Sequence, residues 1–275
     1  MLRFGTGGIP NSSKLHNVFS GIERINELKL GSMELEFVYQ TWLKKDDAKK
    51  VKKLAREQDV ILTSHGSYYI NLNAKDKQKL HASIARIVGA AKICEIAGVK
   101  SLTFHPGFYL RDSKQKAYSN IQNSMQLLVD KLKEEGIKNL KITLETTGKE
   151  SQFGTIQEIV DLSKEFDIIW PCVDFSHIYA RSLGKINTEA KFQQILNQIK
   201  EALGNKAFQD LHMHMSGIAF GQKGEKNHLN LKESDFNYKA VLRVLKSNKV
   251  SGYITCESPN LEQDAVLMRD YYLSL

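Results

Sequence analysis

Cysteine is scarce in this chain of 275 residues, and no apolar stretch approaches the length of a membrane-spanning helix. The three cysteines, Cys94, Cys172 and Cys256, show no paired spacing, which argues for reduced thiols in a reducing compartment. No charged and then apolar leader with a small-residue cleavage site stands at the N-terminus. These absences predict a cytoplasmic protein that does not contact a membrane.

Glycine-rich loops that bind nucleotides are also missing. The run Gly5-Thr6-Gly7-Gly8 lacks the spacing of a dinucleotide-binding fingerprint, and no glycine-rich loop ends in Lys-Ser or Lys-Thr. No linker, low-complexity tract or break in composition divides the chain. We therefore expect residues 1–275 to form one domain.

The charge is the unusual part of the composition. Hydrophobic residues make up 41% and charged residues 25%, which is ordinary for a globular protein with one core. Lys and Arg number 39 against 31 Asp and Glu, giving a net charge of +8. This excess favours a polyanionic partner, although a basic protein without one is the plainer alternative.

Strand-like and helix-like segments alternate along the whole chain. The expected strands are 2–6, 32–37, 60–65, 101–105, 137–145, 168–174, 210–215 and 253–257. The expected helices are 17 or 20 to 28, 46–58, 75–97, 118–135, 155–166, 188–203, 234–246 and 261 to the C-terminus. Such alternation predicts a parallel sheet, and eight repeats in about 250 residues predict a closed (β/α)₈ TIM barrel.

Six of the expected strands end on a side chain that can bind a metal. These residues are His65, His105, Glu145, Asp174, His214 and Glu257. In a barrel the carboxyl ends of the strands converge at one mouth, so the six would meet. A single histidine there is more often a hydrogen-bonded core residue, and a single carboxylate often caps the next helix. Six on six strands instead predict a metal site, because unpaired polar groups are costly to bury.

The donor types favour zinc. Imidazoles lead the set, with His177 and His228 as further candidates in loops, and imidazole-rich shells suit Zn²⁺, with Mn²⁺ or Fe²⁺ as possible substitutes. More than four ligands exceed one tetrahedral site, so two or three ions and a bridging carboxylate are expected. Clustered ions are typical of phosphoester hydrolysis, because they activate water and neutralise the attacking and leaving oxygens. His212, two residues before His214, would lie deeper in the barrel as a packed or supporting residue.

The motifs around these residues resemble a known family. They are His65-Gly-Ser-Tyr-Tyr-Ile-Asn71, Phe104-His-Pro-Gly107, Leu144-Glu-Thr-Thr147, Val173-Asp-Phe-Ser-His177, His212-Met-His-Met-Ser216 and Cys256-Glu-Ser-Pro259. Their order and spacing are similar to those of endonuclease IV, the zinc-dependent apurinic/apyrimidinic (AP) endonuclease among the xylose-isomerase-like barrels. The resemblance covers nearly the whole chain.

The resemblance implies a role for each donor. His65 and His105 would bind the first metal, Glu145 would bridge the first and second, and His177 and His228 would bind a third. Asp174, His214 and Glu257 would complete the second. Glu145 and Glu257 are the residues expected to act in catalysis, by holding the two principal ions and orienting water. The family cuts DNA 5′ to abasic sites in base excision repair and leaves a 3′-hydroxyl.

Two departures from the family affect the loops. The family has an Asp two residues before its third-metal histidine, whereas this chain has Lys226 there, with Glu225 as a displaced substitute. In the loop after the second strand the family inserts an Arg into DNA, whereas this chain has Gln40. The remaining candidates for DNA contact are Tyr39, Trp42, Tyr68, Tyr69, Lys223 and Lys226.

The sequence thus predicts a monomeric, zinc-dependent endonuclease that acts on abasic sites in double-stranded DNA. Two other interpretations remain. A sugar isomerase or epimerase can use the same barrel with a divalent metal, and fold alone does not separate the two. A non-catalytic nucleic-acid binder on a decayed barrel is the third, which the full set of six donors disfavours.

Overall fold

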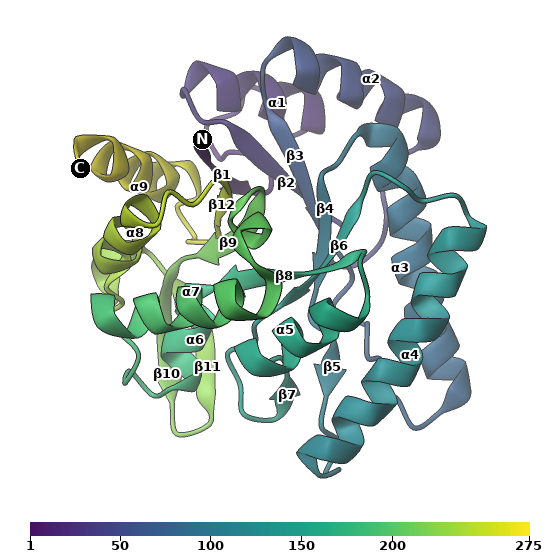
Figure 1. The fold of residues 1–275 in the computed structure, drawn as a ribbon. Helices are drawn as coiled ribbons and strands as arrows, with labels where there is room; N and C mark the ends of the chain where they lie inside the picture. The colour runs from purple at the N-terminus through teal and green to yellow at the C-terminus, as the bar shows by residue number, and fades with distance from the viewer.

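A computed structural model describes residues 1–275, and it confirms the barrel. Eight parallel strands close on themselves in the order β1-β12-β9-β8-β6-β4-β3-β2 (Figure 1). These strands are β1 Leu2–Gly7, β2 Ser32–Glu36, β3 Ile61–His65, β4 Ser101–Phe104, β6 Lys141–Glu145, β8 Ile169–Asp174, β9 Leu211–Met215 and β12 Gly252–Cys256. Each agrees with an expected strand to within a few residues.

Helices surround the strands on the outside of the barrel (Figure 1). They are α1 Val18–Glu27, α2 Lys45–Glu57, α3 Lys77–Ala97, α4 Lys114–Glu134, α5 Ile156–Glu165, α6 Phe175–Arg181, α7 Glu189–Leu203, α8 Tyr238–Ser247 and α9 Glu262–Ser274, with short 3₁₀ turns at Asn205–Phe208 and Leu231–Glu233. None of the helices combines the length and apolar character needed to cross a membrane.

Side-chain caps fix most helix starts. Asn17 caps α1, and Thr155 forms a capping box with Glu158 at α5. The expected start of a helix at residue 234 was wrong, because α8 begins only after Asn237, which caps it. The Ser234 hydroxyl instead accepts a hydrogen bond from the Ile218 amide and donates one to the Ile218 carbonyl. Those bonds anchor the segment after β9.

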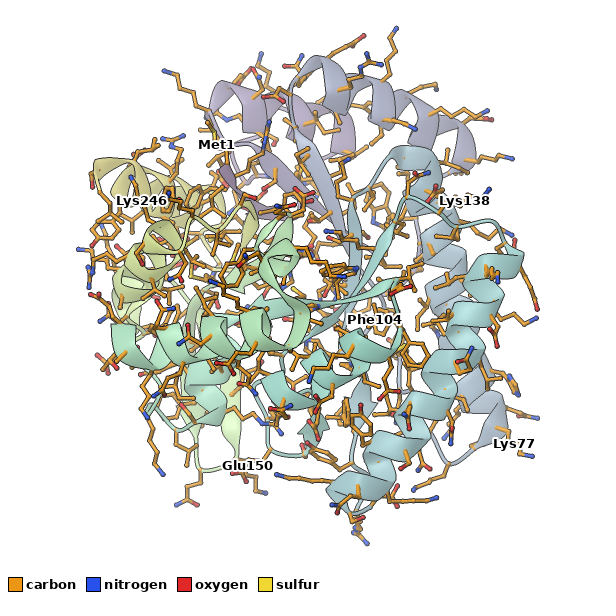
Figure 2. All side chains as sticks on the ribbon, in the orientation of Figure 1. Met1, Lys77, Phe104, Lys138, Glu150 and Lys246 are labelled. Atoms are coloured by element: carbon orange, nitrogen blue, oxygen red, sulfur yellow. The ribbon has the colours of Figure 1, made fainter.

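The apolar core lies between the strands and the helices. Outward-facing strand residues such as Leu35, Leu62 and Ile142 are at most 2% exposed and pack in a single cluster with the helices. Figure 2 places Phe104 centrally, whereas Lys77, Lys138 and Lys246 lie at the periphery. Side chains alternate along a strand, so the opposite faces of these strands point into the barrel.

The barrel interior is polar rather than apolar. Alternation places the residue two before each mouth donor on the same inward face. Those inward residues are Thr63, Thr103, Thr143, Cys172, His212 and Thr255, all at most 1% exposed. Ser101 Oγ lies 2.8 Å from Nδ1 of His212, although β4 and β9 are not neighbours in the barrel, so this contact crosses the interior.

Two small sheets at the carboxyl ends of the strands were not predicted. β5 Gly107–Phe108 pairs with β7 Gln152–Phe153, and β10 Gly217–Gly221 pairs with β11 Gly224–Leu229. Both lie at the lower edge of Figure 1. Their strands are short or rich in glycine, so their sequences resemble loops. They raise the wall around the barrel mouth.

Candidate metal centre

Glu145, at the end of β6, is the centre of the cluster. Its Oε2 lies 3.1 Å from Nε2 of His65 and 2.9 Å from Nε2 of His105. Its Oε1 lies 3.2 Å from Nδ1 of His177 and 3.3 Å from Nδ1 of His214. Four histidines that are far apart in the sequence therefore meet at one fully buried carboxylate.

Asp174 and Glu257 extend the cluster on the side of His214. Nδ1 of His214 lies 3.4 Å from Oε1 of Glu257, and Glu145, Asp174, His214 and Glu257 place one donor atom each within 4.8 Å of one another. Oδ2 of Asp174 and Oε2 of Glu257 are buried without a hydrogen-bond partner. Unpartnered buried carboxylate oxygens are costly in a closed protein, so these two fit a metal-binding role.

A third group forms around His177. Its Nε2 lies 3.6 Å from Oε2 of Glu225 and 3.5 Å from Nε2 of His228. Glu225 therefore supplies the carboxylate of this group, where the family has an Asp and this chain has Lys226. All the donors predicted from the strand ends and loops lie in three adjoining groups.

A β-bulge explains how Glu225 reaches this group. In a regular strand Lys226, two residues before His228, would share its face, and Glu225 would point the other way. The pairing of β11 with β10 shifts register between Asn227 and Glu225, which makes Lys226 the extra residue. The shift turns Glu225 to the side of His228 and leaves Lys226 exposed.

Two glycines allow the loop after β6 to approach β11 closely enough for Glu225 to reach His177. The Glu225 amide donates to the Gly148 carbonyl at 3.0 Å. A Cβ at Gly148 would lie 2.6 Å from Oε2 of Glu225 and 3.1 Å from Cδ2 of His177. Gly224 has φ +91° and faces the same carbonyl. The third group thus depends on two positions that have no side chain.

The histidines are oriented by backbone carbonyls. Nδ1 of His65 lies 2.8 Å from the Gly66 oxygen, Nδ1 of His177 3.0 Å from that of Thr146, and Nδ1 of His228 3.1 Å from that of Glu257. A carbonyl only accepts, so each Nδ1 carries a hydrogen, and each Nε2 is the nitrogen that faces the cluster and can bind an ion in place of its proton. This arrangement fits metal ligands better than core histidines.

The cluster requires positive charge. Burial opposes ionisation of Glu145, but the neighbouring histidines outweigh it and hold its pKa well below the ordinary range. Burial likewise opposes protonation of His65, yet Glu145 and other carboxylates raise its pKa to about 10. Burial raises the pKa of Asp174 to about 6. Protons or metal cations must therefore balance these carboxylates.

Two glutamates on β2 were missed from the sequence. Glu34 lies inside the barrel against His212 and His214, and Glu36 lies at the mouth. Burial and the carboxylates of Glu34 and Glu257 raise the pKa of Glu36 to about 8. The available signal was the placement of acids at alternate positions of a parallel strand, where both faces are usually apolar.

The cluster opens into a cavity of about 280 Å³. Its wall includes all the metal donors except Asp174 and His214, together with Tyr68, Phe108, Lys149 and Gln152. Lys149 was not singled out from the sequence. Arg181 donates to the Thr147 hydroxyl and the Lys149 carbonyl and so braces the loop after β6.

The predicted DNA-contact residues lie around the mouth in different settings. Tyr68 is 57% exposed, 5.6 Å from the His65 ring and 6.0 Å from the Tyr39 ring. Tyr69 is exposed beside Arg86. The remaining residues do not line the metal cavity: Gln40, Lys223 and Lys226 are exposed, and Trp42, which donates to the Glu36 carbonyl, lines a separate pocket of about 680 Å³.

Comparisons with known proteins agree with the fold. The family described as "Xylose isomerase-like TIM barrel" matches residues 22–271. An uncharacterized protein of Methanocaldococcus jannaschii, MJ0133, is 46% identical over all of this chain and 98% of its own length. An endonuclease 4 homolog of Dictyostelium discoideum is 25% identical over 68% of this chain, which spans only 36% of that protein.

Two solved structures share the barrel over nearly its full length. Endonuclease IV from Thermus thermophilus superposes with a TM-score of 0.75 at 16% identity, covering 99% of this chain and 100% of that one. A D-tagatose 3-epimerase-like protein superposes with a TM-score of 0.71 at 18% identity, covering 93% and 92%. At such identities the likeness establishes the fold alone.

Proposed function

This chain belongs to the xylose isomerase-like TIM barrel family, and from that premise we propose that it is a metal-dependent endonuclease that hydrolyses the phosphodiester 5′ to abasic sites in DNA. Sequence similarity to an endonuclease 4 homolog supports this choice. The net charge of +8 also suits a polyanionic substrate.

The observation that carries the proposal is the joining of three donor groups at one mouth. The groups are His65 with His105 and Glu145; Glu145 with Asp174, His214 and Glu257; and His177 with Glu225 and His228. Glu145 belongs to two of them, and its Oε1 also lies 3.2 Å from His177. One ion suffices to polarise a carbonyl, whereas several adjoining ions suit an in-line displacement at phosphorus.

Each group would hold one ion, and the imidazole content favours zinc, with Mn²⁺ or Fe²⁺ as substitutes. When bound, such ions would lower the pKa of water and neutralise the charge of the attacking and leaving oxygens. Glu145 would hold the first two ions together. Glu257, whose Oε2 is buried without a partner, would accept a hydrogen bond from the attacking water.

The residues of the mouth would position the DNA. Tyr68 presents an exposed ring beside His65 on which a base or sugar can stack. Lys149 lies in the cavity wall, where its ammonium would attract the phosphate. We also propose that Gln40 and Tyr39 reach the duplex, because both are exposed at the end of β2. Trp42 would hold that loop in place by donating a hydrogen bond from its indole to the Glu36 carbonyl.

A sugar epimerase is the second candidate, favoured by one specific observation. The group of Glu145, Asp174, His214 and Glu257 could hold a single ion against a small polyol without help from the other donors. That function leaves the group of His177, Glu225 and His228 without a role. It also leaves the exposed tyrosines of the mouth unexplained.

Incision of a defined duplex tests the proposal. The zinc-loaded protein is incubated with an end-labelled duplex that contains one tetrahydrofuran abasic analogue, and with the matched intact duplex. We expect EDTA-sensitive incision of the first only, giving a 3′-hydroxyl that a DNA polymerase extends. No incision of the abasic duplex, together with epimerisation of a ketohexose, would overturn the proposal in favour of the epimerase.

A further inference from the structure

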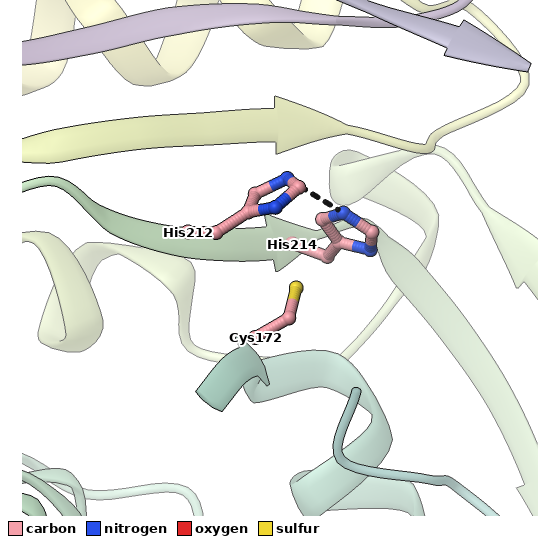
Figure 3. Close-up of side chains that lie close together, drawn as sticks. All are labelled: Cys172, His212 and His214. Atoms are coloured by element: carbon pink, nitrogen blue, oxygen red, sulfur yellow. Dashed lines mark hydrogen bonds between the residues drawn. The ribbon is translucent and has the colours of Figure 1, made fainter. Parts of the chain in front are cut away.

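Deeper in the barrel than the metal donors, the buried carboxylate of Glu34 contacts two histidines of β9, His212 and His214. Glu34 projects from β2 into the barrel, and β9 stands three positions away in the strand order. Oε2 of Glu34 lies 2.9 Å from Nε2 of His212, and Oε1 of Glu34 lies 3.1 Å from Nε2 of His214. All three side chains are at most 1% exposed. Figure 3 shows both imidazoles on the inward face of β9, with Cys172 close by.

The hydrogen-bonding capacity of these groups fixes where the protons lie. Thr63 donates its hydroxyl to Oε2 of Glu34 at 2.8 Å, and the Ser101 hydroxyl lies 2.8 Å from Nδ1 of His212. An ionised carboxylate only accepts, so the nitrogens that face it are those that carry hydrogen. The two Nε2 atoms are 3.2 Å apart because both face the same carboxylate.

The bond between Glu34 and Nε2 of His214 decides that Nδ1 is the nitrogen of His214 available to a metal. With Nε2 bonded to Glu34, Nδ1 is the nitrogen that an ion can take in place of a proton, and it lies 3.3 Å from Oε1 of Glu145 and 3.4 Å from Oε1 of Glu257. This orientation is the reverse of that of His65 and His177, whose Nδ1 atoms are taken by backbone carbonyls. No backbone carbonyl is bonded to His214 in this way, so a side chain must set its tautomer.

We propose that Glu34 is a positioning residue that holds His214 with Nδ1 free to bind the metal, and that His212 braces Glu34 from the other side. The inference rests on the metal-binding part of the proposed function and not on the identity of the substrate. It gives a role to two buried residues, Glu34 and His212, that do not face the cavity. Supporting carboxylates of this kind typically change metal affinity about 10–100-fold.

Metal binding without DNA tests the proposal. Co²⁺ affinity is measured by competition for the wild type, Glu34→Gln and Glu34→Asp, with folding checked by circular dichroism. We expect Glu34→Gln to lower the affinity about 10–100-fold and Glu34→Asp, which keeps the charge, to recover part of it. Glu262→Gln is the matched control, since Glu262 is also buried but accepts from the Asn11 and Ser12 amides and bonds to neither histidine of β9. An affinity of Glu34→Gln within twofold of wild type would overturn the inference.

A spectroscopic readout reports the tautomer directly. Long-range ¹H–¹⁵N spectra of the histidine rings in the zinc-loaded protein should show His214 protonated on Nε2 in the wild type and a mixed tautomer in Glu34→Gln. If Glu34→Gln does not fold, Thr63→Val, which removes only one donor to Glu34, should still weaken Co²⁺ binding severalfold. His214 protonated on Nδ1 in the wild type would contradict the proposal.

Cobalt spectra also distinguish a different use of the same residues. Cys172, His212 and His214 lie within 4.8 Å of one another and could themselves hold an ion. A thiolate-to-cobalt band that Cys172→Ser abolishes would mean that Glu34 faces a buried ion, and it would overturn the positioning role. Loss of Co²⁺ affinity in Glu34→Gln together with no incision of abasic DNA would support this inference and contradict the nuclease.

Discussion

The two faces of the barrel strands differ in what they are built from. The outer face carries residues such as Leu35, Leu62 and Ile142, which pack against the helices in the apolar cluster. The inner face carries Glu34 and His212, and it ends at the mouth donors. The outer face stabilises the fold by removing apolar area from water, at about 25 cal/mol per Å².

The inner face does not follow the same logic. Burying carboxylates and imidazoles together often contributes little net stability, because desolvation offsets their attraction. A barrel interior filled with branched apolar residues would be the more usual solution. The difference teaches that stability and metal binding are separated across each strand, so variants on the two faces should have different phenotypes. The predictions below run from the largest expected effect to the smallest.

Removing the charge of Glu145 should have the largest effect on function. Glu145→Gln takes away the carboxylate shared by two donor groups, so the loss of metal affinity should exceed the about 10–100-fold typical of supporting residues. Metal analysis after dialysis checks this. Because the neighbouring histidines lose the carboxylate that pairs with their protons, the metal-free variant should unfold more easily than the metal-free wild type. Retention of full metal content would contradict the assignment.

A substitution in the apolar cluster against which the outer face packs should do the opposite. Leu196 on α7 is fully buried, and Leu196→Ala should lower the free energy of unfolding by about 2–5 kcal/mol through the cavity that it leaves. The metal affinity of the folded fraction should not change. Denaturant unfolding and Co²⁺ titration measure the two quantities, and a parallel loss of affinity would break the separation.

Gly148 tests the third donor group alone. Gly148→Ala would place a Cβ 2.6 Å from Oε2 of Glu225, so we expect the stoichiometry of bound metal to fall by one ion per chain. Gly89→Ala is the control, because a Cβ there meets nothing within 4 Å and should stabilise α3 by about 0.5–1 kcal/mol. An unchanged number of bound metal ions in Gly148→Ala would mean that Glu225 is not a metal ligand.

The metal-free protein should lose stability as the pH rises. His65 keeps its proton in the folded state up to about pH 10, whereas it loses it near 6.5 when unfolded. Its stabilisation is therefore fully present below pH 6.5 and is lost between 6.5 and about 10. Glu36, with a folded pKa of about 8, acts in the same direction between 4.5 and 8. For each such group, the free energy of unfolding falls by about 1.4 kcal/mol for every unit by which the pH rises between its unfolded and folded pKa.

Thermal unfolding of the metal-free protein between pH 6 and 9 measures this slope. Glu36→Gln should make it shallower. Metal-loaded protein should show the reverse trend, because metal competes with protons for the same nitrogens. A metal-free stability that rises with pH over this range would contradict the charge balance described for the site.

The smallest expected effects come from single lysines at the mouth. Lys149→Ala, Lys223→Ala and Lys226→Ala should each reduce the slope of log affinity for abasic DNA against log salt by about one, one lost phosphate contact each. Lys138→Ala, which precedes β6 and so lies at the opposite end of the barrel from the mouth, should leave the slope unchanged (Figure 2). Equal slopes for all four variants would place the DNA elsewhere.

Much of this architecture could be predicted from the sequence because barrels repeat a simple rule. Alternating segments gave the eight strands, and the fixed position of the strand ends brought His65, Glu145 and Asp174 together. The residues that could not be predicted depend on irregular backbone or on tertiary contacts. Glu225 enters through a bulge, which the alternation of a strand does not foresee.

Glu34 was overlooked for a different reason. Its strand, Ser32–Glu36, alternates as an exposed strand would, and nothing in its own sequence shows that the opposite wall of the barrel carries His212. Ser234 illustrates the same limit at a helix start, where a contact with Ile218 took precedence over capping. Local patterns identify elements and their ends, whereas contacts across the barrel decide what the side chains do.

The most direct test is the number of metal ions bound per chain, measured by native mass spectrometry on protein purified without chelators and repeated with Glu145→Gln. The account predicts two or three ions, zinc above all, in the wild type and their loss in the variant. A single ion in both proteins, or none in either, would contradict a shared metal centre at the barrel mouth.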